Sequence, residues 1–337
     1  MVDKQGIITA MKYSALFLKV PALQGATMRV NSNGSPYVFT GGFNMVFQLT
    51  KGGKKWAFRV WHVPMKDTKE RFQKISQYLT ALGLPYFADF VFDEKGLIVN
   101  GEALDTIRME WVEGSLLKKY LEDYLTDKVV LQDLATKVSA MCKVLRDNQI
   151  SHGDLQEGNI LIDAQGQIKL VDYDSLCIPS LEGQEESVTG LKGYQHPSRF
   201  TEAKASLRSD YFSELIIYLS ILGIAESPSL WDKYSVKDSS YLLFTPTDFE
   251  SLEGSGIYQD LKGLSPEIDR LLFVLADYLQ TPSYLELRPF PSVPVLPLQV
   301  ATWSRTFCRT RPVVSSPNSI RPWVLDFLPW CAEGVDC

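Results

Sequence analysis

The chain has 337 residues, which is long enough for one large domain or for two of ordinary size. A hydrophobic fraction of 45% and a charged fraction of 22% describe a soluble globular protein with an ample core. The net charge of −6 gives no electrostatic reason to expect a nucleic-acid or membrane partner.

Apolar runs and cysteines indicate the compartment. The longest apolar run, 215–224, is interrupted by Tyr218 and Ser220 and is too short to span a membrane. The N-terminus carries no hydrophobic signal segment. The five cysteines are scattered without a C-x-x-C pair, so neither a zinc site nor a disulfide framework is indicated. We therefore expect a cytoplasmic protein with no nucleic-acid and no membrane partner.

The first part of the chain predicts an extension followed by β-structure. Residues 1–36 mix apolar pieces with a polar turn, and we expect them to pack on the β-structure that comes after them. Two β-rich runs, 37–49 and 55–63, flank a glycine turn at 51–54 and predict an antiparallel hairpin.

A helix and further strands come next. Residues 69–82 have helical spacing, with one apolar face made by Phe72, Ile75, Tyr78, Leu79 and Leu82. Strands are expected between 87 and 112, with a turn at 93–96. Two helices should follow at 116–125 and 129–145, the second with apolar residues at helical spacing along its length.

The most informative stretch is 151–175, SHGDLQEGNILIDAQGQIKLVDYDS. It predicts a loop carrying His152, Asp154 and Asn159, then a short hairpin of two apolar strands that ends on Asp172. The hairpin returns Asp172 to the loop, so three oxygen-bearing side chains converge. Such a group suits Mg²⁺ held together with phosphate oxygens. Asp154 is then left as a base or orienter for an attacking hydroxyl.

The rest of the chain is mainly helical. An apolar helix is predicted over 211–222, with Asp210 at its start, and further helices, notably 268–279, complete a helical region. Residues 299–337 are rich in Pro, Ser, Arg and Trp without a clear period, and we expect a flexible tail.

The stretch 151–175 resembles the catalytic core of the protein kinase superfamily. The catalytic-loop pattern H-R-D-L-x-x-x-N is matched at His152, Asp154, Leu155 and Asn159, and the D-F-G pattern at Asp172-Tyr173-Asp174. Gly153 replaces the arginine, as in small-molecule kinases of the aminoglycoside phosphotransferase type. The whole run is more closely similar to a group of bacterial protein kinase-like proteins with H-G-D-L-Q-x-G-N and V-D-Y-D.

The resemblance implies an α+β, two-lobed protein kinase-like fold that binds ATP between the lobes. The small antiparallel β lobe would comprise residues 37–112 and the larger helical lobe residues 113–298. Residues 1–36 would be an N-terminal extension, and 299–337 a tail outside the fold.

The resemblance also implies a nucleotide site in the β lobe. Gly41, Gly42 and Val46 would belong to the loop that covers the phosphates. The lysine that binds the α- and β-phosphates is replaced by Arg59, which keeps the positive charge but has a planar fork. Glu70, the carboxylate of the helix that usually pairs with this cation, comes early in the helix, and we expect it to be a solvated charge.

Beyond the β lobe, the resemblance implies an adenine site, a metal site and a catalytic base. Backbone groups from Glu110 to Val112 would contact adenine. Asn159 and Asp172 would hold Mg²⁺, and Asp154 would act on the acceptor hydroxyl. Asp210 would fasten the backbone of the catalytic loop, a role that must be weighed against simple helix capping.

The implied function is that of an ATP-dependent phosphotransferase similar to a Ser/Thr protein kinase. It would transfer the γ-phosphate of Mg-ATP to a hydroxyl acceptor, with a protein substrate or partner. One alternative is a pseudokinase that binds nucleotide or acts as a scaffold, favoured by Arg59 and by Gln156 in the place of a catalytic lysine. A second is a small-molecule kinase, favoured by His-Gly-Asp but opposed by Asp210 and by the turn at 194–197, which resembles the end of an activation segment.

Overall fold

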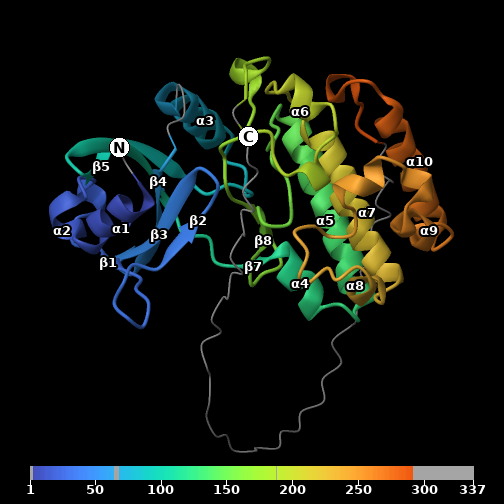
Figure 1. Ribbon diagram of the computed structural model, residues 1–337, viewed down its shortest axis with the longest axis horizontal. Coiled ribbons are helices and arrows are strands. Elements are labelled where there is room, and N and C mark those ends of the chain that lie inside the picture. The colour runs from blue at the N-terminus through green and yellow to red at the C-terminus, as the bar shows by residue number, and fades with distance from the viewer. Residues whose placement is uncertain (1–2, 64–67, 187, 291–337) are drawn as a thin grey trace, which may run out of the picture. The chain divides into compact units, whose positions relative to one another are not determined.

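The β lobe is built on an antiparallel sheet with strand order β1-β3-β4-β6-β5, in which β2 also pairs with β3 (Figure 1). The computed structural model describes residues 3–63, 68–186 and 188–290. The strands are β1 (Thr27–Met28), β2 (Val38–Thr40), β3 (Asn44–Lys51), β4 (Lys54–Trp61), β5 (Phe90–Val99) and β6 (Glu102–Glu110). β3 and β4 form the predicted hairpin, which turns at Gly52 and Gly53, both with positive φ.

The turn predicted at 93–96 is wrong. These residues form an irregularity inside β5, where the register with β6 shifts between Asp93 and Leu97. The hairpin instead turns at Asn100 and Gly101, with φ of 51° and 85°, the pair favoured in two-residue turns. Gly96 serves close packing, because a Cβ there would lie 2.0 Å from the hydroxyl of Thr106.

Both faces of the sheet are covered. The N-terminal segment, with α1 (Lys4–Lys12), α2 (Ser14–Phe17) and the 3-10 helix η1 (Pro21–Leu23), lies beside the sheet (Figure 1). Its apolar residues pack on one face of the sheet. Ile7, Met11 and Leu18 there meet apolar side chains of β3, β4 and β5. Helix α3 (Thr68–Leu82) covers the other face through Phe72 and Ile75.

The second lobe is helical. Its α-helices are α4 (Leu117–Asp123), α5 (Lys128–Asp147), α6 (Arg199–Glu202), α7 (Asp210–Glu226), α8 (Leu230–Lys233), α9 (Gly256–Leu261) and α10 (Pro266–Gln280). A small sheet is formed by β7 (Ser115–Leu116), β8 (Ile160–Ile162) and β9 (Ile168–Leu170). Its 3-10 helices are η2 (Pro179–Leu181), η3 (Lys192–Tyr194), η4 (Pro246–Phe249), η5 (Leu252–Gly254) and η6 (Tyr284–Glu286).

Helices α5 and α7 pack along each other at the centre of this lobe (Figure 1). α7 buries residues around most of its circumference, which explains its nearly uninterrupted apolar sequence. Together the two lobes form the two-lobed α+β arrangement that the sequence predicts. Within the described ranges, no helix combines the length and apolarity needed to cross a membrane. The predicted tail, 299–337, lies outside the described residues.

Candidate nucleotide and catalytic site

The loop that carries Asp154 runs from the end of α5 to β8, and hydrogen bonds from its backbone to Asp210 hold it in place. The two carboxylate oxygens of Asp210 accept hydrogen bonds from the backbone N–H groups of His152 and Gly153, the latter at 2.9 Å. His152 is fully buried, and its Nε2 lies 3.0 Å from the carbonyl oxygen of Val171. The aspartate at the start of α7 therefore fastens the loop, as the resemblance implies.

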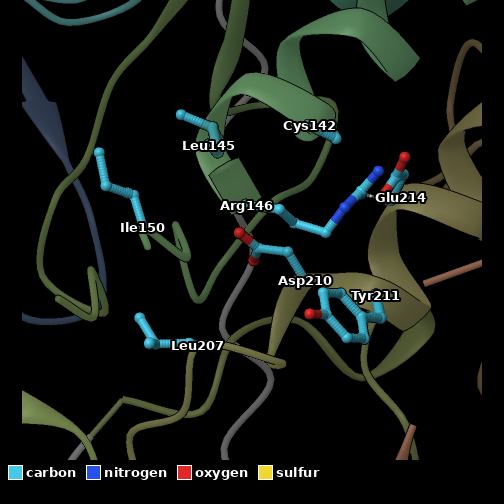
Figure 2. Close-up of a pocket in the computed structure, with 8 residues that line it drawn as sticks. All are labelled: Cys142, Leu145, Arg146, Ile150, Leu207, Asp210, Tyr211 and Glu214. Carbon is cyan, nitrogen blue, oxygen red and sulfur yellow. Dashed lines mark hydrogen bonds and ion pairs between the residues drawn. The ribbon is translucent and has the colours of Figure 1, made fainter. Parts of the chain in front are cut away.

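An ion pair lies next to Asp210. Figure 2 shows Asp210 beside Arg146 of α5 and Glu214 of α7, which form an ion pair. The three side chains line a cavity of about 10 Å³, room for about one water molecule. Burial raises the pKa of Glu214 to about 7, although Arg146 opposes the shift. Helices α5 and α7 thus place buried polar groups next to Asp210, the residue that holds the loop carrying Asp154.

Gly153 takes a conformation that an arginine could not share. Its φ is +79°, and a Cβ at this position would lie 2.1 Å from the carbonyl oxygen of Ser175. An arginine reaches the same loop from α6 instead. Arg199 is fully buried, donates to the carbonyl oxygen of Gly153, and pairs with Glu186 at 2.8 Å. Sequence reasoning missed Arg199, because nothing local distinguishes it from a surface arginine.

Asp154 and Asn159 lie together in the loop. The Asn159 amide nitrogen lies 2.8 Å from the Asp154 carbonyl oxygen and 3.2 Å from its Oδ2. Oδ1 of Asp154 accepts from the backbone N–H of Leu191 at 3.1 Å. Burial, together with the charge of Asp172, raises the pKa of Asp154. Because the amide nitrogen of Asn159 faces Asp154, its amide oxygen is the end available to a cation.

Arg59 is paired with two carboxylates of the 172–174 loop. Its position in β4 is opposite Val46 in β3, and its Nη2 lies 2.9 Å from Oδ1 of Asp172 and also bonds Asp174. With its oxygen turned toward the guanidinium, the Asn44 amide accepts from Nε of Arg59 at 3.1 Å. Burial raises the pKa of Asp174 to about 6, and Arg59 counteracts part of that rise.

Helix α3 contacts the same loop with a cation rather than a carboxylate. Glu70 is exposed and pairs with Lys74 at 2.5 Å, in agreement with its expected role as a solvated charge. Arg71 donates to the carbonyl oxygens of Asp174, at 3.2 Å, and Leu176, at 2.8 Å. The sequence contained one signal for Asp174, the second aspartate of V-D-Y-D, and none for Arg71.

The remaining residues predicted to bind nucleotide lie in a turn of the β sheet or at the end of strand β6. Gly41 and Gly42 form the turn between β2 and β3, which closes with a hydrogen bond from Gly41 N–H to the Asn44 carbonyl oxygen at 2.9 Å. Glu110 ends β6 opposite Trp56 of β4. Val112 lies just beyond that end, in the link to β7.

The donor set fits Mg²⁺ that is bound jointly with phosphates. Among the described residues, no cluster of three or more His, Cys, Asp or Glu side chains is arranged to hold a metal by itself. Mg²⁺ usually takes one or two protein ligands and completes its octahedron with phosphate oxygens and water. Asp172 has a side chain that is 42% exposed, so a carboxylate oxygen can reach such an ion.

Comparison with known proteins identifies the family. Residues 40–242, more than half of the chain, match the family model described as the protein kinase domain. The chain belongs to the protein kinase domain family.

Its relatives include bacterial and eukaryotic kinases. The chain is 33% identical over 120 residues to serine/threonine-protein kinase PrkC of Bacillus subtilis, which is 34% of this chain and 18% of that protein. It is 28% identical over 168 residues to the phosphorylase b kinase gamma catalytic chain, liver/testis isoform, of Bos taurus (47% and 40%). It is 26% identical over 193 residues to probable serine/threonine-protein kinase kinX of Dictyostelium discoideum (54% and 17%). Each match spans less than half of the relative's length.

Proposed function

We propose that this chain is a phosphotransferase of the bacterial H-G-D-L-Q-x-G-N type, which transfers the γ-phosphate of Mg-ATP to a hydroxyl group of a protein. The observation that carries the proposal is the placing of two pairs close together: Asp154 with Asn159 in one loop, and Arg59 of the β lobe with Asp172, whose charge also acts on Asp154. Convergence of a base, a metal carboxylate and a phosphate-binding cation is what phosphoryl transfer requires.

Each side chain has a distinct part in this mechanism. Asn159 and Asp172 would hold Mg²⁺, which neutralises phosphate charge when it is bound. Arg59 would bind the α- and β-phosphates through its guanidinium. Asp154 would orient the acceptor hydroxyl and take its proton, a role that its raised pKa favours.

The proposed enzyme should be slow. Gln156, in the place of a lysine that assists the γ-phosphate, is buried and neutral, and its Oε1 accepts from the N–H of Gly158 at 3.2 Å. The transition state therefore lacks one cation that protein kinases usually supply.

The test is phosphate transfer from γ-labelled ATP to the chain itself and to a general protein acceptor. Asp154→Ala should abolish transfer, a loss of at least roughly a hundredfold, because the general base is gone. ATP binding, followed by thermal unfolding, should persist, whereas Asp172→Ala should weaken Mg²⁺-dependent binding. Full transfer by the Asp154→Ala protein would exclude the assigned role.

A pseudokinase is the second candidate, and two contacts favour it. Arg59 forms an ion pair with Asp172, the carboxylate proposed to bind Mg²⁺, and the backbone N–H of Leu191 donates a hydrogen bond to Asp154. Both groups are thus already occupied by contacts within the chain. A wild-type protein that gains thermal stability from nucleotide but transfers no phosphate would establish this alternative. At nucleotide about a hundred times its dissociation constant, the gain should be ~2.7 kcal/mol.

A further inference from the structure

The two carboxylates that bind Arg59 differ sharply in exposure. The Asp172 side chain is 42% exposed, whereas those of Asp174 and Arg59 are 5% and 7% exposed. A metal ion arriving with nucleotide can therefore reach Asp172 but not the oxygen of Asp174 that faces Arg59. The single guanidinium is shared between an accessible carboxylate and a buried one.

No carboxylate of α3 is available for Arg59. Glu70 is the acidic residue of this helix, and it faces solvent in a pair with Lys74. The helix instead presents Arg71, which donates to the backbone carbonyl oxygens of Asp174 and Leu176. The contact between helix and loop thus runs through backbone acceptors, which leaves the Asp174 side chain directed at Arg59.

We propose that Asp174 is a positioning residue that retains the Arg59 guanidinium when Asp172 binds the metal ion. This inference rests on the proposed Mg-nucleotide site and assigns to the 172–174 loop the anchoring carboxylate that α3 lacks. Without Asp174, Arg59 has Asp172 as its remaining carboxylate partner, and the arginine competes with Mg²⁺ for the same oxygen atoms. A charge-assisted hydrogen bond of this kind is strong enough to change metal affinity by roughly tenfold.

The test is a titration of Mg²⁺ at saturating ADP, with the midpoint of thermal unfolding as the readout. Asp174→Asn should raise the half-saturating Mg²⁺ concentration by about tenfold. In the Arg59→Met background, adding Asp174→Asn should change the Mg²⁺ requirement by less than about threefold relative to Arg59→Met alone, because no arginine then competes for Asp172. The double variant also avoids an unpaired buried charge.

Asp93→Asn is the matched control. It removes a partly buried carboxylate that pairs with Arg108 at 2.9 Å between β5 and β6, and it leaves the contacts of Arg59 intact. We expect it to change the Mg²⁺ requirement by less than about threefold. Asp174→Gly, the residue of the D-F-G pattern, serves as a second variant if asparagine prevents folding, which circular dichroism will show.

The outcomes separate this inference from the proposed function. A wild-type protein with no Mg²⁺-dependent response to ADP would refute the nucleotide site and the inference with it. If the wild type responds and Asp93→Asn has the same effect as Asp174→Asn, Asp174 acts only as one more negative charge, and the positioning role alone is overturned. An equally large effect of Asp174→Asn in the Arg59→Met background would overturn it as well.

Discussion

At the scale of single residues, the backbone at Gly153 excludes the arginine of the H-R-D pattern. The arginine of H-R-D would place a Cβ 2.1 Å from the carbonyl oxygen of Ser175, on a backbone with φ of +79°. L-residues pay about 1–2 kcal/mol for such a backbone even without a clash. The guanidinium of Arg199 therefore contacts this loop from α6, where its backbone is helical.

Gly153→Ala should destabilise the protein well beyond the cost of its backbone conformation. Gly183 is the matched control, because its φ is also +79° but a Cβ there has no neighbour within 4 Å. We expect Gly153→Ala to lose about 1–3 kcal/mol more free energy of unfolding than Gly183→Ala, owing to overpacking. Urea denaturation measures both values, and equal losses would contradict the steric explanation.

At the scale of elements, the catalytic loop is clamped between α7, through Asp210, and α6, through Arg199. The clamp also reaches the segment after β9, because Arg199 pairs with Glu186 in a fully buried contact. Phosphorylation orders such segments in many kinases by placing a phosphate against an arginine. Here a carboxylate of the chain itself already occupies the partner position.

Arg199→Met should cost about 3–5 kcal/mol of unfolding free energy, since it leaves the Glu186 carboxylate buried without its partner. The double variant Arg199→Met/Glu186→Gln should be more stable than the single variant, because no buried charge stays unpaired.

Arg270 and Glu267 form the control pair, at 2.7 Å on the surface of α10. Arg270→Met should lose less than about 1 kcal/mol. Thermal and urea unfolding compare the three variants. A single Arg199→Met variant as mild as Arg270→Met would show that the buried pair does not stabilise the loop.

At the scale of the whole molecule, the N-terminal segment contributes residues between Ile7 and Leu23 to the core of the β lobe. Leu18 bridges Leu97 of β5, and β1 pairs with β3 at the edge of the sheet. The apolar face of β3 and β4 is covered by this segment, so its loss would expose a contiguous hydrophobic surface.

Ile7→Ala in α1 should therefore destabilise the β lobe. Ile7 is fully buried against the sheet, and the expected loss is about 2–5 kcal/mol. Its neighbour Ile8 is partly buried, and Ile8→Ala should lose clearly less because its environment can relax into solvent. Denaturation followed by tryptophan fluorescence distinguishes the two. Similar small losses would mean that the N-terminal segment contributes little to the core.

Several features were predictable because their signals are local. The apolar period of 129–145 predicted α5, the apolar run after Asp210 predicted α7, and the turn between two short strands predicted the β8–β9 hairpin. The 151–175 motif led to the family, because its spacing keeps Asp154 and Asn159 in one loop. The glycine at 96 misled the turn prediction, since it marks close packing against Thr106 rather than a reversal of the chain.

The sequence by itself therefore determined the long helices α5 and α7, the β8–β9 hairpin, the family, and the loop that holds Asp154 and Asn159 together. Only the tertiary structure decided which charges meet. Arg59 is separated from Asp172 and Asp174 by 113 and 115 positions, and Arg199 from Gly153 by 46. Periodicity and spacing act over a few residues, whereas the pairing of buried charges depends on which side chains the packed lobes exclude from water.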